Sequence, residues 1–326
     1  MADTSQKYQD FGKKDVSKMT PEEIKTHLKH YDLGELDYFE AITEGIENSN
    51  YLIATHRHDH QFLSILTLVE GANAAKVSQV SAVMKHLAHY GLPIPNPRLS
   101  QDDQGHPDLQ GKPTLFMVKL PGEHLETVSP EHCRQLGAML ARLHTISTAY
   151  PEPIKNAFDS SWMDQALRDV SPHLSKAEIT LLQATIDRYE ALESSNLPQG
   201  LIHGDLFKDN ILFKDDALVG VLDFFHIGQD LWLMDLAIAL NDWCMDQQFQ
   251  AMPAHATAML EGYHTQRPLE PEEQRALNEI RQIAAARFSL TRFGTEAGGQ
   301  FRKDPYEQLT RLKVLQQAVS FATGPR

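Results

Sequence analysis

The chain has 326 residues, which is long for one compact core and predicts two lobes. The formal net charge of −14 argues against binding to nucleic acid, which requires a clustered basic surface. No apolar run approaches the length of a membrane helix, and the polar N-terminus does not resemble a signal peptide. Because only Cys133 and Cys244 are present, a reducing, cytoplasmic location is expected.

The first part of the chain is predicted to be rich in strands. Residues 1–19 are polar and are expected to form a flexible extension. Thr20, Pro21 and Glu23 form a capping-box pattern, which predicts a helix that ends near Tyr31. The remaining elements expected in this part are strands at 39–43, 50–55 and 62–69, a helix at 74–90 and a strand within 111–122 that leaves through a Pro-Gly turn.

Helices dominate the rest of the chain. Apolar residues recur at helical spacing after Ser129, and long helices are expected at 176–194, 232–249, 251–263 and 271–293. The pattern predicts an α+β fold of the protein-kinase type, with a small antiparallel N-lobe and a larger, mainly helical C-lobe. We place the N-lobe, which binds nucleotide in the cleft, at 20–120, and the catalytic and acceptor-binding C-lobe at 121–326.

One motif carries the chemistry. His203-x-Asp205-Leu206-x-x-x-Asn210 has the spacing of the kinase catalytic loop, with Gly204 in place of arginine. Asp223 then occupies the position of the kinase Asp-Phe-Gly aspartate. A predicted antiparallel hairpin between Asn210 and Asp223 places both side chains at the same end.

These residue types suit phosphoryl transfer. Asp205 would accept the proton of the acceptor hydroxyl, while His203 would orient the loop. Asn210 and Asp223 would supply the hard oxygen ligands that Mg²⁺ prefers. Taken singly, the three acidic or amide residues could be a loop residue, a turn residue and a helix cap, but their joint spacing favours a kinase site.

Other candidate residues carry weaker signals. Gly45 and the Ser49 hydroxyl could cradle phosphates, although a plain hairpin turn explains them as well. The His-rich segment at 56–60 is predicted to be a solvated turn rather than a metal site. Asp235 stands at a helix start, which favours a structural role. Arg287 and Arg292 lie on a late helix, where arginines serve lobe packing more often than substrate contact.

Residues 203–225 resemble the aminoglycoside phosphotransferase and choline kinase superfamily, which favours His-Gly-Asp in the catalytic loop. The sequence is most similar to its homoserine kinase branch. The segments that carry this likeness in order along residues 20–315 include EGIENSNY at 44–51, GLPIPNP at 91–97, HGDLFKDNILF at 203–213 and DLAIALNDWC at 235–244.

The resemblance implies ATP and Mg²⁺ as cofactors, L-homoserine as acceptor and O-phospho-L-homoserine as product, within threonine biosynthesis. It implies that Asp205 is the base and that Asn210 and Asp223 hold the metal. It also implies a nucleotide site, in which the phosphates lie under Gly45, Ile46, Ser49 and Asn50, and the adenine meets the backbone of Lys119 and Leu120.

The sequence departs from the family pattern at several places, of which two bear on the site. Thr67 stands where a kinase has its third-strand lysine, and Lys76 is the nearest candidate to replace it. Phe225 and His226 stand where the branch usually has Tyr-Phe. These departures leave the catalytic loop intact and bear on the phosphate contacts and the acceptor.

The acceptor therefore stays open between several small molecules. An amino acid needs a cation for its carboxylate, which Arg287 or Arg292 could supply, and an oxygen for its ammonium, from Asn48 or Asp235. Choline, ethanolamine or an aminoglycoside would instead need acidic or aromatic contacts. A third hypothesis is a nucleotide-binding protein that lacks transfer activity. The sequence does not indicate an oligomeric state.

Overall fold

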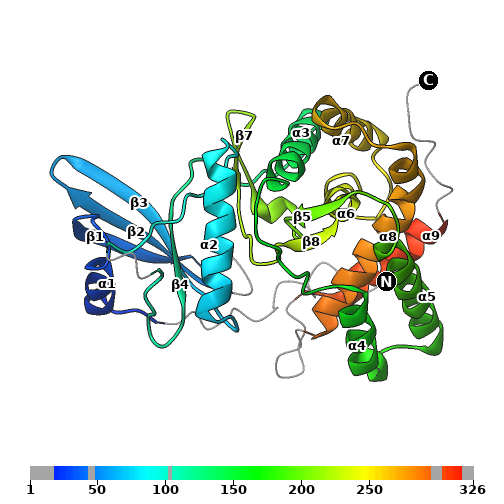
Figure 1. The fold of residues 1–326 in the computed structure, drawn as a ribbon, viewed down its shortest axis with the longest axis horizontal. Helices are drawn as coiled ribbons and strands as arrows, with labels where there is room; N and C mark the ends of the chain where they lie inside the picture. Colours follow the sequence, from blue (N-terminus) through cyan, green and yellow to red (C-terminus); the bar gives the residue numbers. More distant parts are fainter. Residues whose placement is uncertain (1–17, 43–47, 102–104, 295–302, 318–326) are drawn as a thin grey trace, which may run out of the picture. The chain divides into compact units, whose positions relative to one another are not determined.

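A computed structural model describes residues 18–42, 48–101, 105–294 and 303–317 (Figure 1). The predictions for residues 1–17, Gly45 and Ile46 therefore lie outside the described residues. The chain divides into two compact units, Met1–Gly122 with Gly220–Leu222, and Glu123–Val219 with Asp223–Arg326. The short segment at 220–222 was predicted to lie in the C-lobe. It joins the first unit, where the amide of Val221 donates to the carbonyl of Pro93 at 2.8 Å.

The first unit is built on a four-stranded antiparallel sheet in the order β1-β2-β3-β4 (Figure 1). Its elements are α1 (Pro21–Leu28), β1 (Glu35–Ile42), β2 (Ser49–Arg57), β3 (His60–Leu68), α2 (Ala74–His89) and β4 (Thr114–Val118). The predicted antiparallel sheet is confirmed, although β1 begins four residues before the predicted start at 39.

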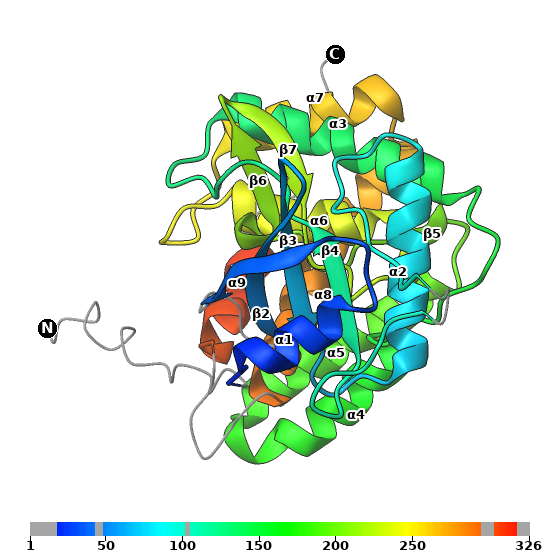
Figure 2. The same cartoon turned by 90° about the vertical axis from the view of Figure 1, so that its left-hand side faces the viewer.

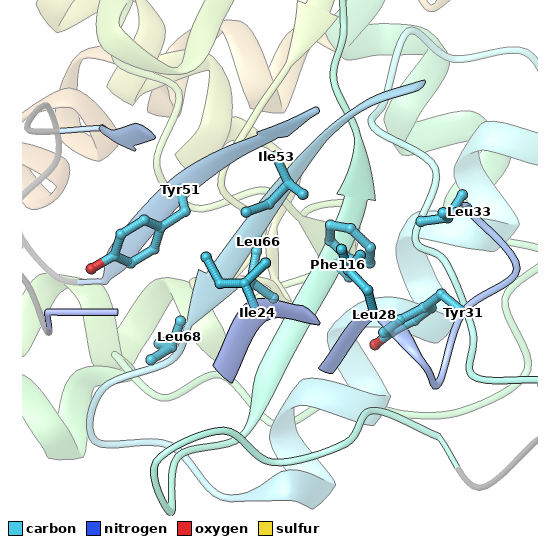
Figure 3. Packing of buried hydrophobic residues seen from close by; sticks show 9 residues of the cluster. All are labelled: Ile24, Leu28, Tyr31, Leu33, Tyr51, Ile53, Leu66, Leu68 and Phe116. Carbon is cyan, nitrogen blue, oxygen red and sulfur yellow. The ribbon is translucent and has the colours of Figure 1, made fainter. Parts of the chain in front are cut away.

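Helix α1 begins where the capping box predicted. The Thr20 hydroxyl accepts from the amide of Glu23, and the Glu23 carboxylate accepts from the amide of Thr20 at 2.8 Å. Figure 3 shows Ile24 and Leu28 of this helix in one cluster with side chains of the sheet. Burying each such aliphatic side chain contributes roughly 1.5–3 kcal/mol to the stability of the unit.

The second unit is mainly helical (Figure 2). Its helices are α3 (Pro130–Ser147), α4 (Ser160–Val170), α5 (Lys176–Glu193), α6 (Trp232–Trp243), α7 (Pro253–Gln266), α8 (Pro271–Gly294) and α9 (Pro305–Gln317). Three predicted helices, those for α5, α7 and α8, match closely, whereas α4 and α9 were not predicted. Helix α6 was predicted to continue to residue 249. It ends at Trp243 because the Asp246 carboxylate accepts from the amides of Gln248 and Gln250 and stabilises a turn.

Helices α3 and α7 approach each other at backbone distance. A Cβ atom on Gly137 of α3 would overlap the carbonyl oxygen of Met259, and one on Gly262 of α7 would overlap that of Arg134. The two glycines thus face each other's helix reciprocally. Figures 1 and 2 both show helices α3 and α7 side by side.

Two short ribbons place the functional residues of this unit. Strands β5 (Gln199–Ile202) and β8 (Gly228–Leu231) pair antiparallel, with Ile202 opposite Gly228. Strands β6 (Ile211–Lys214) and β7 (Ala217–Val221) form the predicted hairpin, which is confirmed. Its two turn residues, Asp215 and Asp216, both have positive φ, as the turn of a tight hairpin requires.

No helix among the described residues is long and apolar enough to cross a membrane.

Candidate active site

The loop that follows β5 carries the catalytic motif. Gly204 has φ +79°, and a Cβ atom there would lie 2.7 Å from the carbonyl oxygen of His226. Both the left-handed backbone and the close approach favour glycine at this position. This geometry explains why the chain has Gly204 where the protein-kinase loop has arginine.

Asp235, in the first turn of α6, holds the backbone of this loop through hydrogen bonds. Its side chain is fully buried, and its two oxygens accept from the amides of His203 and Gly204, each at 2.7 Å. Nε2 of His144 lies 3.2 Å from the same carboxylate. With its oxygens engaged in this way, Asp235 is better suited to fixing the loop than to meeting an acceptor ammonium.

His144 is itself enclosed between α6 and α7. Its Nδ1 lies 2.8 Å from the hydroxyl of Tyr263, and its ring stacks on Trp232 with an interplanar angle of 4°. Burial lowers the pKa of His144, although Asp235 opposes this change. The neutral imidazole therefore connects Tyr263 of α7 to Asp235, the residue that holds the catalytic loop.

His203 lies inside the loop rather than at its surface. Its side chain is buried, its Nδ1 accepts from the amide of Asp205 at 3.2 Å, and its ring packs edge-on against Phe224. This arrangement agrees with the predicted role of orienting the loop.

Asp205 is held by the amide group of Asn210, whose Nδ2 donates to the Asp205 backbone oxygen at 2.7 Å and to its Oδ2 at 2.9 Å. Its other oxygen, Oδ1, lies 3.7 Å from Nδ1 of His226. Burial alone would raise the pKa of Asp205, but His226, His203 and Arg287 outweigh it and lower this pKa to about 2. The carboxylate is therefore ionised at neutral pH and can accept a proton.

Asn210 and Asp223 fit the role of metal ligands. Because the amide nitrogen of Asn210 is bonded to Asp205, its carbonyl oxygen is the atom left to face a cation. Asp223 follows the hairpin with φ +61°, and its Oδ1 accepts from the amide of Phe225 at 3.3 Å. The described residues contain no cluster of three or more His, Cys, Asp or Glu able to hold a metal.

The two arginines of α8 differ in their partners. Nη1 of Arg292 donates to the Glu307 carboxylate at 2.7 Å and to the backbone oxygen of Asp304 at 3.1 Å. The guanidinium of Arg287 instead lies over the rings of Phe158 and Phe288, 4.4 and 4.7 Å from their centroids. Arg292 thus has the packing role, and Arg287 remains the candidate for an acceptor.

The sequence predictions missed several residues near Arg287. The ring of Phe158 contacts the ring of His226 at 4.8 Å between centroids. Asp230 accepts from the Tyr189 hydroxyl at 2.6 Å and from Nδ2 of Asn156 at 2.8 Å, and burial raises its pKa to about 6. The sequence could have pointed to His226, because this residue departs from the pattern of the branch. It contained no signal that pointed to Phe158.

The nucleotide candidates of the first unit lie at two places. At the start of β2, the buried Ser49 hydroxyl donates to Glu70 at 3.3 Å, and Asn50 Oδ1 accepts from Thr67 at 2.7 Å. The Asn48 side chain accepts from the amide of Glu70 at 3.0 Å.

The second place follows β4. The amide of Lys119 donates to the carbonyl of Leu63 at 3.1 Å, and its Nζ lies 3.4 Å from the carbonyl of Leu120. The expected third-strand lysine is replaced by Thr67. A cation that the sequence did not single out, Lys112, pairs with Glu70 at 2.8 Å.

The sequence of residues 39–303 matches the phosphotransferase enzyme family. Two proteins named homoserine kinase are similar over most of their length. The one from Methylobacillus flagellatus is 34% identical over 83% of this chain and 84% of its own. The one from Methylobacillus glycogenes is 35% identical over 90% of this chain and 93% of its own.

Two solved structures resemble the fold. An amicoumacin kinase in complex with AMP-PNP and Ca²⁺ has a TM-score of 0.71 at 15% identity, covering 90% of this chain and 92% of its own. A choline/ethanolamine kinase family protein from Mesorhizobium loti has a TM-score of 0.64 at 16% identity, covering 93% and 97%. These likenesses confirm the predicted kinase-like fold class.

Proposed function

The chain belongs to the phosphotransferase enzyme family, and from this premise we propose that it is an ATP-dependent homoserine kinase. The observation that carries the proposal is the loop in which Asn210 orients Asp205 above the buried Asp235. It is supported by relatives of that name that match at 34–35% identity over more than four fifths of both chains. The product, O-phospho-L-homoserine, would serve threonine biosynthesis.

Asp205 acts as the base in this proposal. Its ionised carboxylate accepts the proton of the acceptor's primary hydroxyl as the hydroxyl oxygen forms a bond to the γ-phosphorus of ATP. The bond from that phosphorus to the β–γ bridging oxygen breaks, and ADP leaves. His203 and Asp235 hold the backbone of the loop during the transfer.

Asn210 and Asp223 would hold Mg²⁺ through their side-chain oxygens. When bound, the ion neutralises charge that develops on the phosphate oxygens. The structure's own contribution is to fix the Asn210 amide so that its nitrogen faces Asp205.

The remaining assignments concern the nucleotide and the ammonium of the acceptor. Neither predicted candidate for the ammonium is assigned, because both oxygens of Asp235 accept from the loop and the side-chain oxygen of Asn48 accepts from the amide of Glu70. The proposed nucleotide contacts are those of the sequence prediction, with phosphates at Gly45, Ile46, Ser49 and Asn50 and adenine at Lys119 and Leu120.

The experiment is a coupled measurement of ADP release with Mg-ATP and L-homoserine, choline, ethanolamine or an aminoglycoside, with Asp205→Asn as the control. We expect turnover with homoserine alone and its loss in the variant. Turnover with another acceptor would discard homoserine and keep the phosphotransferase mechanism. Binding of ATP without turnover of any of these acceptors would remove the proposed activity.

A further inference from the structure

Arg287 differs from the other buried arginines of the second unit in what surrounds its guanidinium. It is 2% exposed, and its Nε has no hydrogen-bond acceptor among the described residues. On the same helix, Arg281 donates through Nε to Asn241 at 2.9 Å. Arg292 and Arg311 reach side-chain oxygens through their Nη atoms, although Nε of Arg311 also lacks an acceptor among the described residues.

A buried guanidinium that interacts with nearby carboxylates through charge, with no hydrogen-bond acceptor at Nε, is an informative arrangement. Removing a guanidinium from water costs several kcal/mol unless hydrogen bonds and an opposite charge compensate. Burial accordingly lowers the pKa of Arg287, although Tyr189, Asp205 and Asp230 act in the opposite direction. An anionic ligand that reached the guanidinium would provide the missing hydrogen bonds at short range.

The guanidinium of Arg287 packs on two aromatic rings. The half-buried ring of Phe158 lies 4.4 Å from the guanidinium carbon, and the ring of Phe288 lies 4.7 Å from it. Stacking on aromatic faces leaves the N–H groups at the edge of the guanidinium, in the fork that matches a carboxylate. The geometry therefore prepares Arg287 for a planar anion.

A series of side-chain contacts connects Arg287 to the catalytic base, Asp205. The ring of Phe158 meets the ring of His226, and Nδ1 of His226 lies 3.7 Å from Oδ1 of Asp205. Arg287 and Asp205 also interact through their charges. One small molecule could place its hydroxyl at Asp205 and an anionic group toward Arg287.

Resting on the proposed function, we propose that Arg287, held by Phe158, binds the carboxylate of the acceptor and restricts acceptors to hydroxyl compounds that carry one. Choline, ethanolamine and aminoglycosides are cations without a carboxylate, and the guanidinium repels them. The residue is thus the specificity determinant on the acceptor side.

The test combines truncated acceptors with variants of Arg287. 4-Hydroxybutanoate lacks the ammonium of homoserine, and 3-aminopropan-1-ol lacks its carboxylate. Each compound is assayed as a substrate and, where turnover is slow, as a competitive inhibitor of homoserine phosphorylation. The enzymes are the wild type, Arg287→Met, Arg287→Lys and the matched control Arg281→Met, which removes another buried guanidinium from the same helix.

In Arg287→Met we expect KM or KI to rise roughly 10- to 100-fold for homoserine and 4-hydroxybutanoate, and not to rise for 3-aminopropan-1-ol, whose ammonium loses only the repulsion of the guanidinium. Arg287→Lys should lie between this variant and the wild type, and Arg281→Met should leave the ratio among the three compounds unchanged. Retained binding of 3-aminopropan-1-ol also reports that the variant is folded.

Two results overturn the inference and are distinguishable. If the wild type phosphorylates homoserine but both Arg287 variants weaken all three compounds equally, Arg287 has a structural role and the proposed function stands. If the wild type does not phosphorylate homoserine, the proposed function fails and the inference fails with it.

Discussion

Replacing Asp235 by asparagine tests how the catalytic loop is held. The two carboxylate oxygens accept separately from the amides of His203 and Gly204, but asparagine has only one oxygen. Its NH₂ group would face the other amide, so one buried N–H would lose its acceptor at a cost of about 1–3 kcal/mol. The bond that remains would lose its charge, which removes about half of its strength. Together these effects should lower the free energy of unfolding by about 2–4 kcal/mol.

Urea denaturation measures this change, and Asp246→Asn is the matched control. A single oxygen of the exposed Asp246 accepts from two amides, so asparagine can keep both bonds, and the loss should stay within about 0.5 kcal/mol. A displaced loop should also lower the kcat of Asp235→Asn on the order of 10²-fold. Equal losses of stability in the two variants would refute the assigned role of Asp235.

Three further predictions concern the base and two buried acids. Asp205→Asn should lower kcat about 10²- to 10⁴-fold with KM for ATP unchanged in the ADP-release assay, and wild-type kcat would remove the base assignment. Because burial raises the pKa of Asp230 to about 6, its folded-state proton stabilises the protein below about pH 4, and this contribution is lost as the pH rises through 6. The stability of the wild type relative to Asp230→Asn should therefore fall by up to about 3 kcal/mol across this range in urea titrations, and a constant difference would contradict it. Glu273→Gln should destabilise the chain by roughly 3–5 kcal/mol in urea, because it breaks the buried pair with Arg267, whereas the exposed Glu272→Gln should cost under about 1 kcal/mol. Similar losses in the two glutamate variants would show that burial does not govern the Arg267 pair.

The sequence predicted best those elements of the fold that depend on local signals. The capping box at Thr20 and the hairpin around Asp215 and Asp216 depend on residues only a few positions apart. Helix α4 also had a cap, because Asp159 accepts from the amide of Trp162, but it lacks the capping box and the first-turn proline that mark α1. The early end of α6 depends on a turn at Asp246 that competes with the helix.

The catalytic loop could be predicted for the same reason, because its functional residues lie within one short stretch. The residues on the acceptor side could not be predicted in this way. Phe158, His226 and Arg287 come from separate parts of the chain, and only tertiary packing brings their side chains together. The choice between Arg287 and Arg292 likewise depends on Glu307, a partner on another helix.

The close crossing of α3 and α7 limits how this protein can vary over evolutionary time. Gly137 and Gly262 each face a carbonyl group of the opposite helix, so any larger residue must move the helices apart. Helix α3 also carries His144, which contacts Asp235 beneath the catalytic loop. A deep mutational scan selected for activity should therefore tolerate almost no substitution at either glycine, although both lie outside the chemistry. A substitution at Gly137 or Gly262 would require compensating changes around Asp235, which holds the catalytic loop.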